Sequence, residues 1–180
     1  MLIHTCSISD LLVVEPKVFP DQRGYFFESY NKKVFNELNL NVEFVQDNLS
    51  KSSKGALRGL HFQTPPHTQG KLISVIKGSI MDVVVDLRSN SGTFGQYFSI
   101  EISEGNHKML WIPKGFAHGF LTLEDDTIFS YKCTDFYNKE SEQCLLWNDP
   151  TLNIQWGIEN PILSEKDKFG KALNDFVGLF

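Results

Sequence analysis

The sequence has few of the features that mark disulfide-rich, metal-binding or membrane proteins. It contains only three cysteines in 180 residues, Cys6, Cys133 and Cys144, and none has Cys-x-x-Cys spacing. An odd number of unpatterned cysteines indicates reduced thiols rather than a disulfide framework. No apolar run approaches the roughly 20 residues of a membrane span. Residues 1–10 lack the basic and apolar segments of a signal peptide, so we expect a cytoplasmic protein that does not bind membranes.

Common cofactor and catalytic motifs are absent as well. The chain has no Gly-x-Gly-x-x-Gly, no Walker loop and no Gly-x-Ser-x-Gly elbow, so dinucleotide, NTPase and hydrolase functions lack support. The net charge of -5 argues against nucleic acid, because nucleic-acid binding depends on basic surface. Metal-binding jelly rolls carry a His-x-His pair, whereas Gln63 follows His61 at that spacing. We therefore expect no metal site.

The chain is patterned as a series of short strands. Hydrophobic residues make up 41% of it and alternate with polar residues in runs that Gly-, Ser- and Asn-rich turns separate. This pattern favours a β-sandwich or barrel, and a double-sheet jelly roll in particular. The length suits one domain over residues 1–180. The predicted strands lie in Lys71–Lys77, Met81–Leu87, Gln96–Ser103, Met109–Ile112, Gly119–Leu123, Thr127–Thr134 and Gln143–Trp147.

Helix signals are few and lie towards the two ends of the chain. Asn31–Leu38 is predicted to form a short helix with Asn31 as its N-cap. The segment Ser164–Asp167 is predicted to begin another. The expected fold is thus all-β with short terminal helices.

Two of the five histidines stand in unusual contexts. On a straight strand His61 shares a face with Gln63, and Arg58 points to the opposite face. From this segment alone, a core histidine bonded to the backbone is preferred over a functional one. His118 lies in a glycine-flanked segment, which is equally compatible with a pocket histidine and with one that caps a backbone carbonyl.

Three more side chains could take part in chemistry. Lys71 lies on an apolar strand face, where its ammonium must reach water or a partner. Tyr131 alternates in phase with apolar residues and could donate a proton. Asp167 falls in the first turn of a predicted helix, where a carboxylate stabilises the helix dipole. Taken singly, all three are better explained by ordinary structural roles.

Seven segments, in this order, resemble one family, the dTDP-4-dehydrorhamnose 3,5-epimerases. They cover nearly the whole chain, which makes the resemblance far more specific than any single motif. The segments are Asp21–Glu28, Phe44–Asn48, Leu57–Gln63, Gln69–Leu72, Trp111–Phe120, Tyr131–Tyr137 and Leu163–Asp167. The resemblance implies a cupin-like double-stranded β-helix that works without a metal or a bound cofactor. It also implies a nucleotide-diphosphate sugar as substrate.

The resemblance assigns a role to each candidate residue. It implies that His61 is the general base and that Asp167 orients it. It implies that Tyr131 donates a proton from the opposite face of the sugar and that Lys71 faces the C4 oxygen. The residues implied to bind substrate are Arg23, Phe26, Glu28, Gln46, Asn48, Arg58, His118, Tyr137, Glu142 and Lys166. Among them, Tyr137 matches a residue that stacks on the base.

These residue types suit epimerisation next to a ketone. Protons on C3 and C5 of a 4-keto sugar are α to the carbonyl, so their removal gives an enolate. Histidine is the natural base near neutral pH, and a carboxylate on its other nitrogen fixes the tautomer. A lysine supplies positive charge to the enolate oxygen, and inversion requires a proton donor on the other face.

The chain departs from the family pattern at three places. Leu49 stands where the family often has histidine, and Gly157 follows Trp156 where the family often has proline. The segment Thr64–Thr68 is also unusual. Family members pair by exchanging N-terminal strands, so the resemblance implies a homodimer in which Arg23 and Glu28 serve the neighbouring site.

The sequence is compatible with several functions. The leading one is a 3,5-epimerase of a dTDP-linked 4-keto-6-deoxy sugar. The same chemistry on another nucleotide sugar, such as a GDP-4-keto-heptose for surface polysaccharide, or at only one carbon, uses the same catalytic set. A 3,4-ketoisomerase and a non-catalytic sugar-binding jelly roll are further alternatives, and the acid–base pair argues against both.

Overall fold

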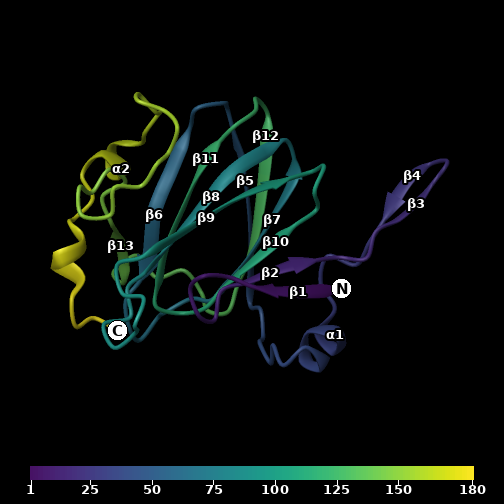
Figure 1. Ribbon diagram of the computed structural model, residues 1–180, viewed down its shortest axis with the longest axis horizontal. Coiled ribbons are helices and arrows are strands. Elements are labelled where there is room, and N and C mark those ends of the chain that lie inside the picture. The colour runs from purple at the N-terminus through teal and green to yellow at the C-terminus, as the bar shows by residue number, and fades with distance from the viewer.

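Two antiparallel β-sheets face each other across a central core in the computed structural model, which describes residues 1–180 (Figure 1). One sheet has the strand order β1-β2-β10-β7-β12-β5 and the other β13-β6-β11-β8-β9. This arrangement confirms the all-β jelly roll expected from the alternating sequence pattern. The strands of the six-stranded sheet are β1 (Leu2–Thr5), β2 (Leu12–Glu15), β5 (Gln46–Ser52), β7 (Lys71–Lys77), β10 (Met109–Ile112) and β12 (Thr127–Cys133). Those of the five-stranded sheet are β6 (Leu57–Gln63), β8 (Ser79–Asp86), β9 (Tyr97–Ser103), β11 (Phe116–Thr122) and β13 (Glu142–Cys144).

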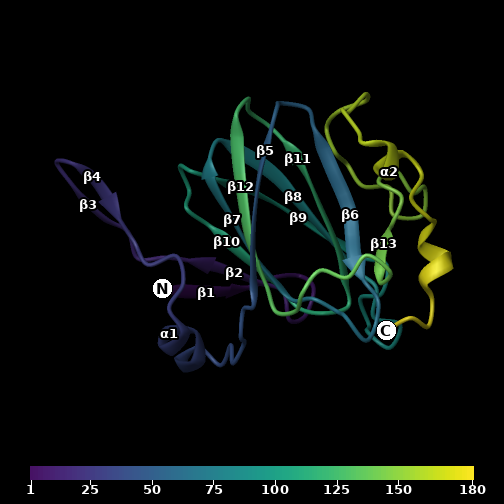
Figure 2. The same ribbon diagram turned by 180° about the vertical axis from the view of Figure 1, so that it is seen from behind.

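Three apolar clusters hold the layers together. The central one lies between the sheets and joins Ile73 and Phe129 of one sheet to Val84 and Phe120 of the other. A second cluster packs the five-stranded sheet against the C-terminal segment through side chains such as Trp156. The third packs the six-stranded sheet against the segment around α1. The C-terminal segment therefore lies beside β6 and β13, close to one end of the sandwich (Figures 1 and 2).

The helices are short, and the two predicted ones are present. Helix α1 (Lys32–Glu37) begins at Asn31, whose side chain accepts from two backbone N–H groups as predicted. Helix α2 (Glu165–Lys168) is capped by Ser164, and a 3₁₀ turn, η1, covers Leu173–Phe176. No helix here is both long and apolar enough to cross a bilayer.

A small hairpin of β3 (Phe19–Asp21) and β4 (Gly24–Phe26) projects away from the sandwich (Figures 1 and 2). Every residue in its two strands is exposed. The exposed side chains include Phe19, Tyr25 and Phe26. A two-stranded hairpin is only marginally stable in water by itself. Because its strands are exposed, little packing within the same chain stabilises this hairpin.

The pairing of β6 with β11 contains a register shift. Because of it, Arg58 lies on the face opposite to the one that the sequence pattern predicted. His61 pairs with His118 and Arg58 with Phe120, so the regular two-residue alternation is broken between them. Gly59 permits this because its φ is +122° and a Cβ there would stand 2.5 Å from the Gly119 Cα. As a result Arg58 and His61 line the same cavity, where strict alternation predicted opposite faces.

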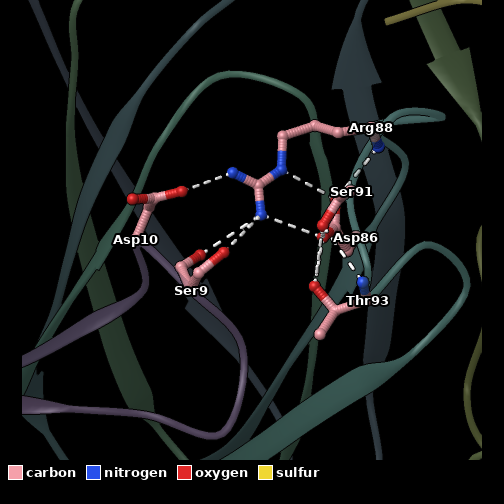
Figure 3. Close-up of polar contacts among 6 residues, drawn as sticks. All are labelled: Ser9, Asp10, Asp86, Arg88, Ser91 and Thr93. Carbon is pink, nitrogen blue, oxygen red and sulfur yellow. Dashed lines mark hydrogen bonds and ion pairs between the residues drawn. The ribbon is translucent and has the colours of Figure 1, made fainter.

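A polar cluster ties the turn after β1 to the end of β8 (Figure 3). The Arg88 guanidinium donates to Asp86, which is fully buried, and to Asp10 at 2.6 Å. Ser91 and Thr93 also donate to the Asp86 carboxylate, each at 2.7 Å. Asp86 thereby holds the Arg88 guanidinium, which joins the loop that follows β8 to Ser9 and Asp10 of the N-terminal turn.

Candidate active site

A cavity of about 620 Å³ opens between the two sheets. Its walls come from β5, β7 and β12 on one side and from β6 and β11 on the other, with the C-terminal segment at the edge. It contains nine of the residues that the sequence singled out: Asn48, Arg58, His61, Lys71, His118, Tyr131, Tyr137, Glu142 and Asp167. Residues from distant parts of the chain therefore meet because the two sheets face each other and the C-terminal segment lies at their edge.

His61 and Asp167 form a hydrogen-bonded pair in this cavity. The His61 Nε2 lies 2.6 Å from the Asp167 Oδ1, and Asp167 is 2% exposed. The Ser164 hydroxyl donates to the other Asp167 oxygen at 2.7 Å. Burial acts to raise the pKa of Asp167, but hydrogen bonds from His61 and Ser164 outweigh it and hold the pKa below its usual value. An ionised Asp167 keeps a proton on Nε2, which leaves the Nδ1 lone pair of His61 free.

Lys71 and Tyr131 approach the same space from the six-stranded sheet. The Lys71 ammonium lies 3.4 Å from the His61 carbonyl oxygen and 5.9 Å from the centre of the Tyr131 ring. Burial lowers the pKa of Lys71, while the negative charges of Asp82 and Glu142 act in the opposite direction. Burial also raises the pKa of Tyr131 to about 12, so its phenol stays protonated over the physiological range.

A second histidine–carboxylate pair lies deeper in the cavity. The His118 Nε2 is 2.8 Å from the Asp82 Oδ2, and Asp82 is fully buried. The other oxygen of Asp82 has no hydrogen-bond partner. Burial lowers the pKa of His118, although Asp82 opposes this. The only sequence signal for Asp82 is that it is an aspartate within an otherwise apolar strand, which does not by itself predict a site residue.

Cys144 is another neighbour of the dyad, and no sequence motif indicates it. It pairs directly with His61 across β13 and β6, and its Sγ lies 4.0 Å from the Asp167 Oδ1. The potential ligand atoms of His61, Cys144 and Asp167 lie within 4.8 Å of one another, and no other group of this kind is found. Burial, followed by the charge of Asp167, raises the pKa of Cys144 to about 11.

Polar side chains at the mouth of the cavity are linked to one another. The Tyr137 hydroxyl donates to Glu142 at 3.1 Å, and Glu142 forms an ion pair with Lys166. The backbone N–H of Tyr137 donates to Gln46 at 2.9 Å, and Gln46 in turn bonds to Asn48. Thus Gln46 and Lys166 support residues of the cavity without lining it themselves.

Three predicted substrate contacts lie outside the cavity of their own chain. Arg23, Phe26 and Glu28 belong to the projecting hairpin or directly follow it. Arg23 is bound to Asp21 at 2.5 Å, and Glu28 accepts from Asn31. Within one chain the structure therefore does not bring these residues to the remaining candidates.

Comparisons with known proteins identify the family. The sequence profile of the family described as dTDP-4-dehydrorhamnose 3,5-epimerase matches residues 5–175. The dTDP-4-dehydrorhamnose 3,5-epimerase of Shigella flexneri is 52% identical over 176 residues, which cover 97% of each protein.

Solved structures give the same result. The dTDP-6-deoxy-D-glucose-3,5-epimerase of Legionella pneumophila, in complex with dTDP-4-keto-L-rhamnose, superimposes with a TM-score of 0.92 at 47% identity, covering 96% of this chain and 93% of the other. A 3'-monoepimerase from Streptomyces bikiniensis, in complex with dTDP-quinovose, gives 0.90 at 30% identity, covering 95% and 87%. This chain belongs to the dTDP-4-dehydrorhamnose 3,5-epimerase family.

Proposed function

We propose that this enzyme inverts C3 and C5 of dTDP-4-dehydro-6-deoxyglucose to give dTDP-4-dehydrorhamnose. One observation carries the proposal. A carboxylate-bound histidine from one sheet lines the same cavity as a protonated tyrosine from the other sheet. The ammonium of half-buried Lys71 lies 3.4 Å from the His61 carbonyl oxygen and 5.9 Å from the centre of the Tyr131 ring. A protein that merely binds a sugar has no need of this arrangement, because binding requires neither a base nor an acid.

His61 acts as the base in the proposed reaction. Its Nε2 proton is held by Asp167, so Nδ1 is the nitrogen that accepts a proton from C3 or C5. The imidazolium that forms is stabilised by the adjacent carboxylate. Removal of a proton α to the ketone places the negative charge on O4 of the sugar.

Lys71 stabilises that charge. Its ammonium is already fixed in a desolvated position, and a preorganised cation at a developing oxyanion contributes strongly to catalysis. His118 adds a second polar group to the same part of the cavity.

Tyr131 completes each inversion. It reaches the cavity from the sheet opposite His61, so its proton arrives at the other face of the enolate. Because its pKa is raised to about 12, the phenol is a weak acid that holds its proton until the enolate needs it. One group therefore acts as the base and the other as the acid, on opposite faces of the sugar, as inversion requires.

The cavity mouth suits the nucleotide half of the substrate. Arg58 offers a guanidinium fork to the diphosphate, and the half-exposed ring of Tyr137 can stack on a planar base. In the proposed dimer, the projecting hairpin supplies Arg23, Phe26 and Glu28 to the site of the neighbouring chain. This accounts for aromatic side chains that are exposed in a single chain.

Proton exchange with deuterated water tests the reaction. The enzyme is incubated with dTDP-4-keto-6-deoxyglucose and, separately, with a GDP-4-keto sugar, and deuterium is read by NMR. Incorporation at C3 and C5 of the dTDP sugar is expected. Incorporation at one carbon would make the enzyme a monoepimerase, and exchange only on the GDP sugar would change the substrate. Folded protein that gives no exchange on either sugar would refute the proposal.

A further inference from the structure

We propose that a zinc-class divalent ion binds to His61, Cys144 and Asp167 and switches the enzyme off. The effect on turnover rests on the proposed function, whereas binding of the ion does not. The three groups come from β6, β13 and α2, so only the folded chain presents them together.

Strand pairing places the thiol beside the dyad. Cys144 lies directly opposite His61 in the antiparallel pairing of β13 with β6, and directly paired residues project to the same side of a sheet. The Asp167 Oδ1 that accepts from His61 at 2.6 Å is also the oxygen 4.0 Å from the Cys144 Sγ. One carboxylate oxygen therefore faces both other donor atoms.

The spacing requires only small side-chain movements to become a metal site. Bond lengths to zinc of about 2.0–2.3 Å place neighbouring tetrahedral ligands roughly 3.3–3.7 Å apart. The present ligand atoms lie within 4.8 Å of one another. The histidine–carboxylate contact must lengthen and the thiol must move inward. The second Asp167 oxygen is held by Ser164, which keeps the carboxylate oriented towards the ion.

Charge balance favours the ion over the free thiolate. The Cys144 Sγ lies 4.0 Å from the Asp167 carboxylate, so a thiolate without a metal would place two negative charges side by side. A divalent ion with one thiolate, one carboxylate and a neutral imidazole makes a group with no net charge, which is the least costly state to bury. The sulfur and nitrogen donors select zinc and similar ions over magnesium and calcium.

The bound ion would remove the catalytic base through a change of tautomer. The metal takes the place of the proton on His61 Nε2, and that proton moves to Nδ1. The thiol proton of Cys144 is released to solvent, so one proton leaves for each ion bound. With Nδ1 protonated, His61 has no lone pair to accept a proton from the sugar, and the reaction stops at its first step.

Metal binding to the resting enzyme provides the first test. Cobalt(II), as a coloured substitute for zinc, is titrated into the wild type, Cys144→Ser and the matched control Cys6→Ser. The wild type and the control should show a near-ultraviolet thiolate-to-cobalt absorption, and calorimetry in buffers of different ionisation enthalpy should show about one proton released. Cys144→Ser should lose the absorption and bind zinc at least about 100-fold more weakly, because even supporting residues contribute 10–100-fold.

Turnover with zinc provides the second test. Zinc should inhibit the wild type and Cys6→Ser, a chelator should reverse the inhibition, and Cys144→Ser should keep its basal activity while resisting zinc. Equal inhibition of wild type and Cys144→Ser would overturn the inference, as would a wild type that binds neither cobalt nor zinc. Failure of the epimerase proposal would appear separately, as metal binding without any proton exchange on sugars.

Discussion

At the residue scale, the proposed base, His61, and the proposed acid, Tyr131, have different environments. Both side chains are half-buried, but His61 is bound to an ionised carboxylate, whereas burial raises the pKa of Tyr131 to about 12. The environments thus prepare one group to accept a proton and the other to donate one. The division can be tested by removing each group in turn.

Replacing the tyrosine should separate proton removal from inversion. Tyr131→Phe leaves the base and Lys71 in place, so deuterium should still enter the starting sugar from the His61 face. Formation of the inverted product should fall by about 10²–10⁴-fold, the usual value of a positioned acid. His61→Asn, as the comparison, should abolish both exchange and product. A Tyr131→Phe enzyme that forms product at the wild-type rate would remove this residue from the mechanism.

Asp82 should set the pH range in which Lys71 is charged. Burial lowers the pKa of Lys71, and the charge of Asp82 is among those that act against this. Asp82→Asn should therefore lower the pKa of Lys71 further and shift the alkaline limb of kcat/KM downward by about one pH unit. The measurement is a pH profile of the wild type and the variant. A reduced plateau with an unmoved limb would mean that Asp82 acts only on packing.

At the element scale, the N-terminal turn is secured by one buried carboxylate. Asp86 is fully buried and accepts from Arg88, Ser91 and Thr93 (Figure 3). Arg88 also lies over the Phe116 ring, 4.4 Å from its centre. Loss of the carboxylate would leave the guanidinium without its principal partner. The cost is therefore expected to exceed that of an exposed ion pair.

Asp86→Ala should lower the free energy of unfolding by about 3–5 kcal/mol at pH 7, as when one member of a buried pair is removed. Burial alone would raise the pKa of Asp86, but its hydrogen bonds hold it below the usual value. The stabilisation is therefore present above the unfolded-state pKa of about 3.9 and is lost as pH falls through the folded-state value. Urea unfolding across pH checks this. The exposed pair of Asp47 with Lys132 is the control, since Asp47→Ala should cost about 0–1 kcal/mol.

At the scale of the whole molecule, the projecting hairpin separates some predicted contacts from the cavity. Arg23 and Glu28 lie outside the cavity of their own chain, and the hairpin exposes Phe19 and Phe26. In the proposed homodimer, each site combines the sheets of one chain with the hairpin of the other.

Mixing two inactive variants should restore activity if the hairpin crosses between chains. In a heterodimer of His61→Asn with Arg23→Ala, one site carries both defects and the other carries none. A mixture that exchanges subunits freely should regain about one quarter of the wild-type activity, since half of the dimers have one intact site in two. Activity that stays at the sum of the separate variants would place Arg23 at the site of its own chain.

Local features of the fold could be predicted from the sequence because they depend on neighbouring residues. The alternation in Lys71–Lys77 predicted a strand, and the Asn31 side chain predicted the start of α1. Arg58 was placed on the wrong face because the register shift next to Gly59 depends on the close approach of β11. A one-dimensional pattern contains no information about that approach.

The candidate site, too, has some features that the sequence predicts and others that only the tertiary structure decides. By itself the sequence predicted the strands between Lys71 and Thr134, the starts of the two helices and, through ordered motifs over most of the chain, which residue types suit epimerisation. It did not predict β1 to β5, and the last predicted strand, Gln143–Trp147, extends past the end of β13 at Cys144. Only the tertiary structure decided that Asp82 stands beside His118 and that Cys144 stands beside His61 and Asp167. Contacts of this kind join residues that are distant in the chain, and they are set by the pairing of strands and the facing of sheets. Their chemistry therefore exists only once the fold has formed.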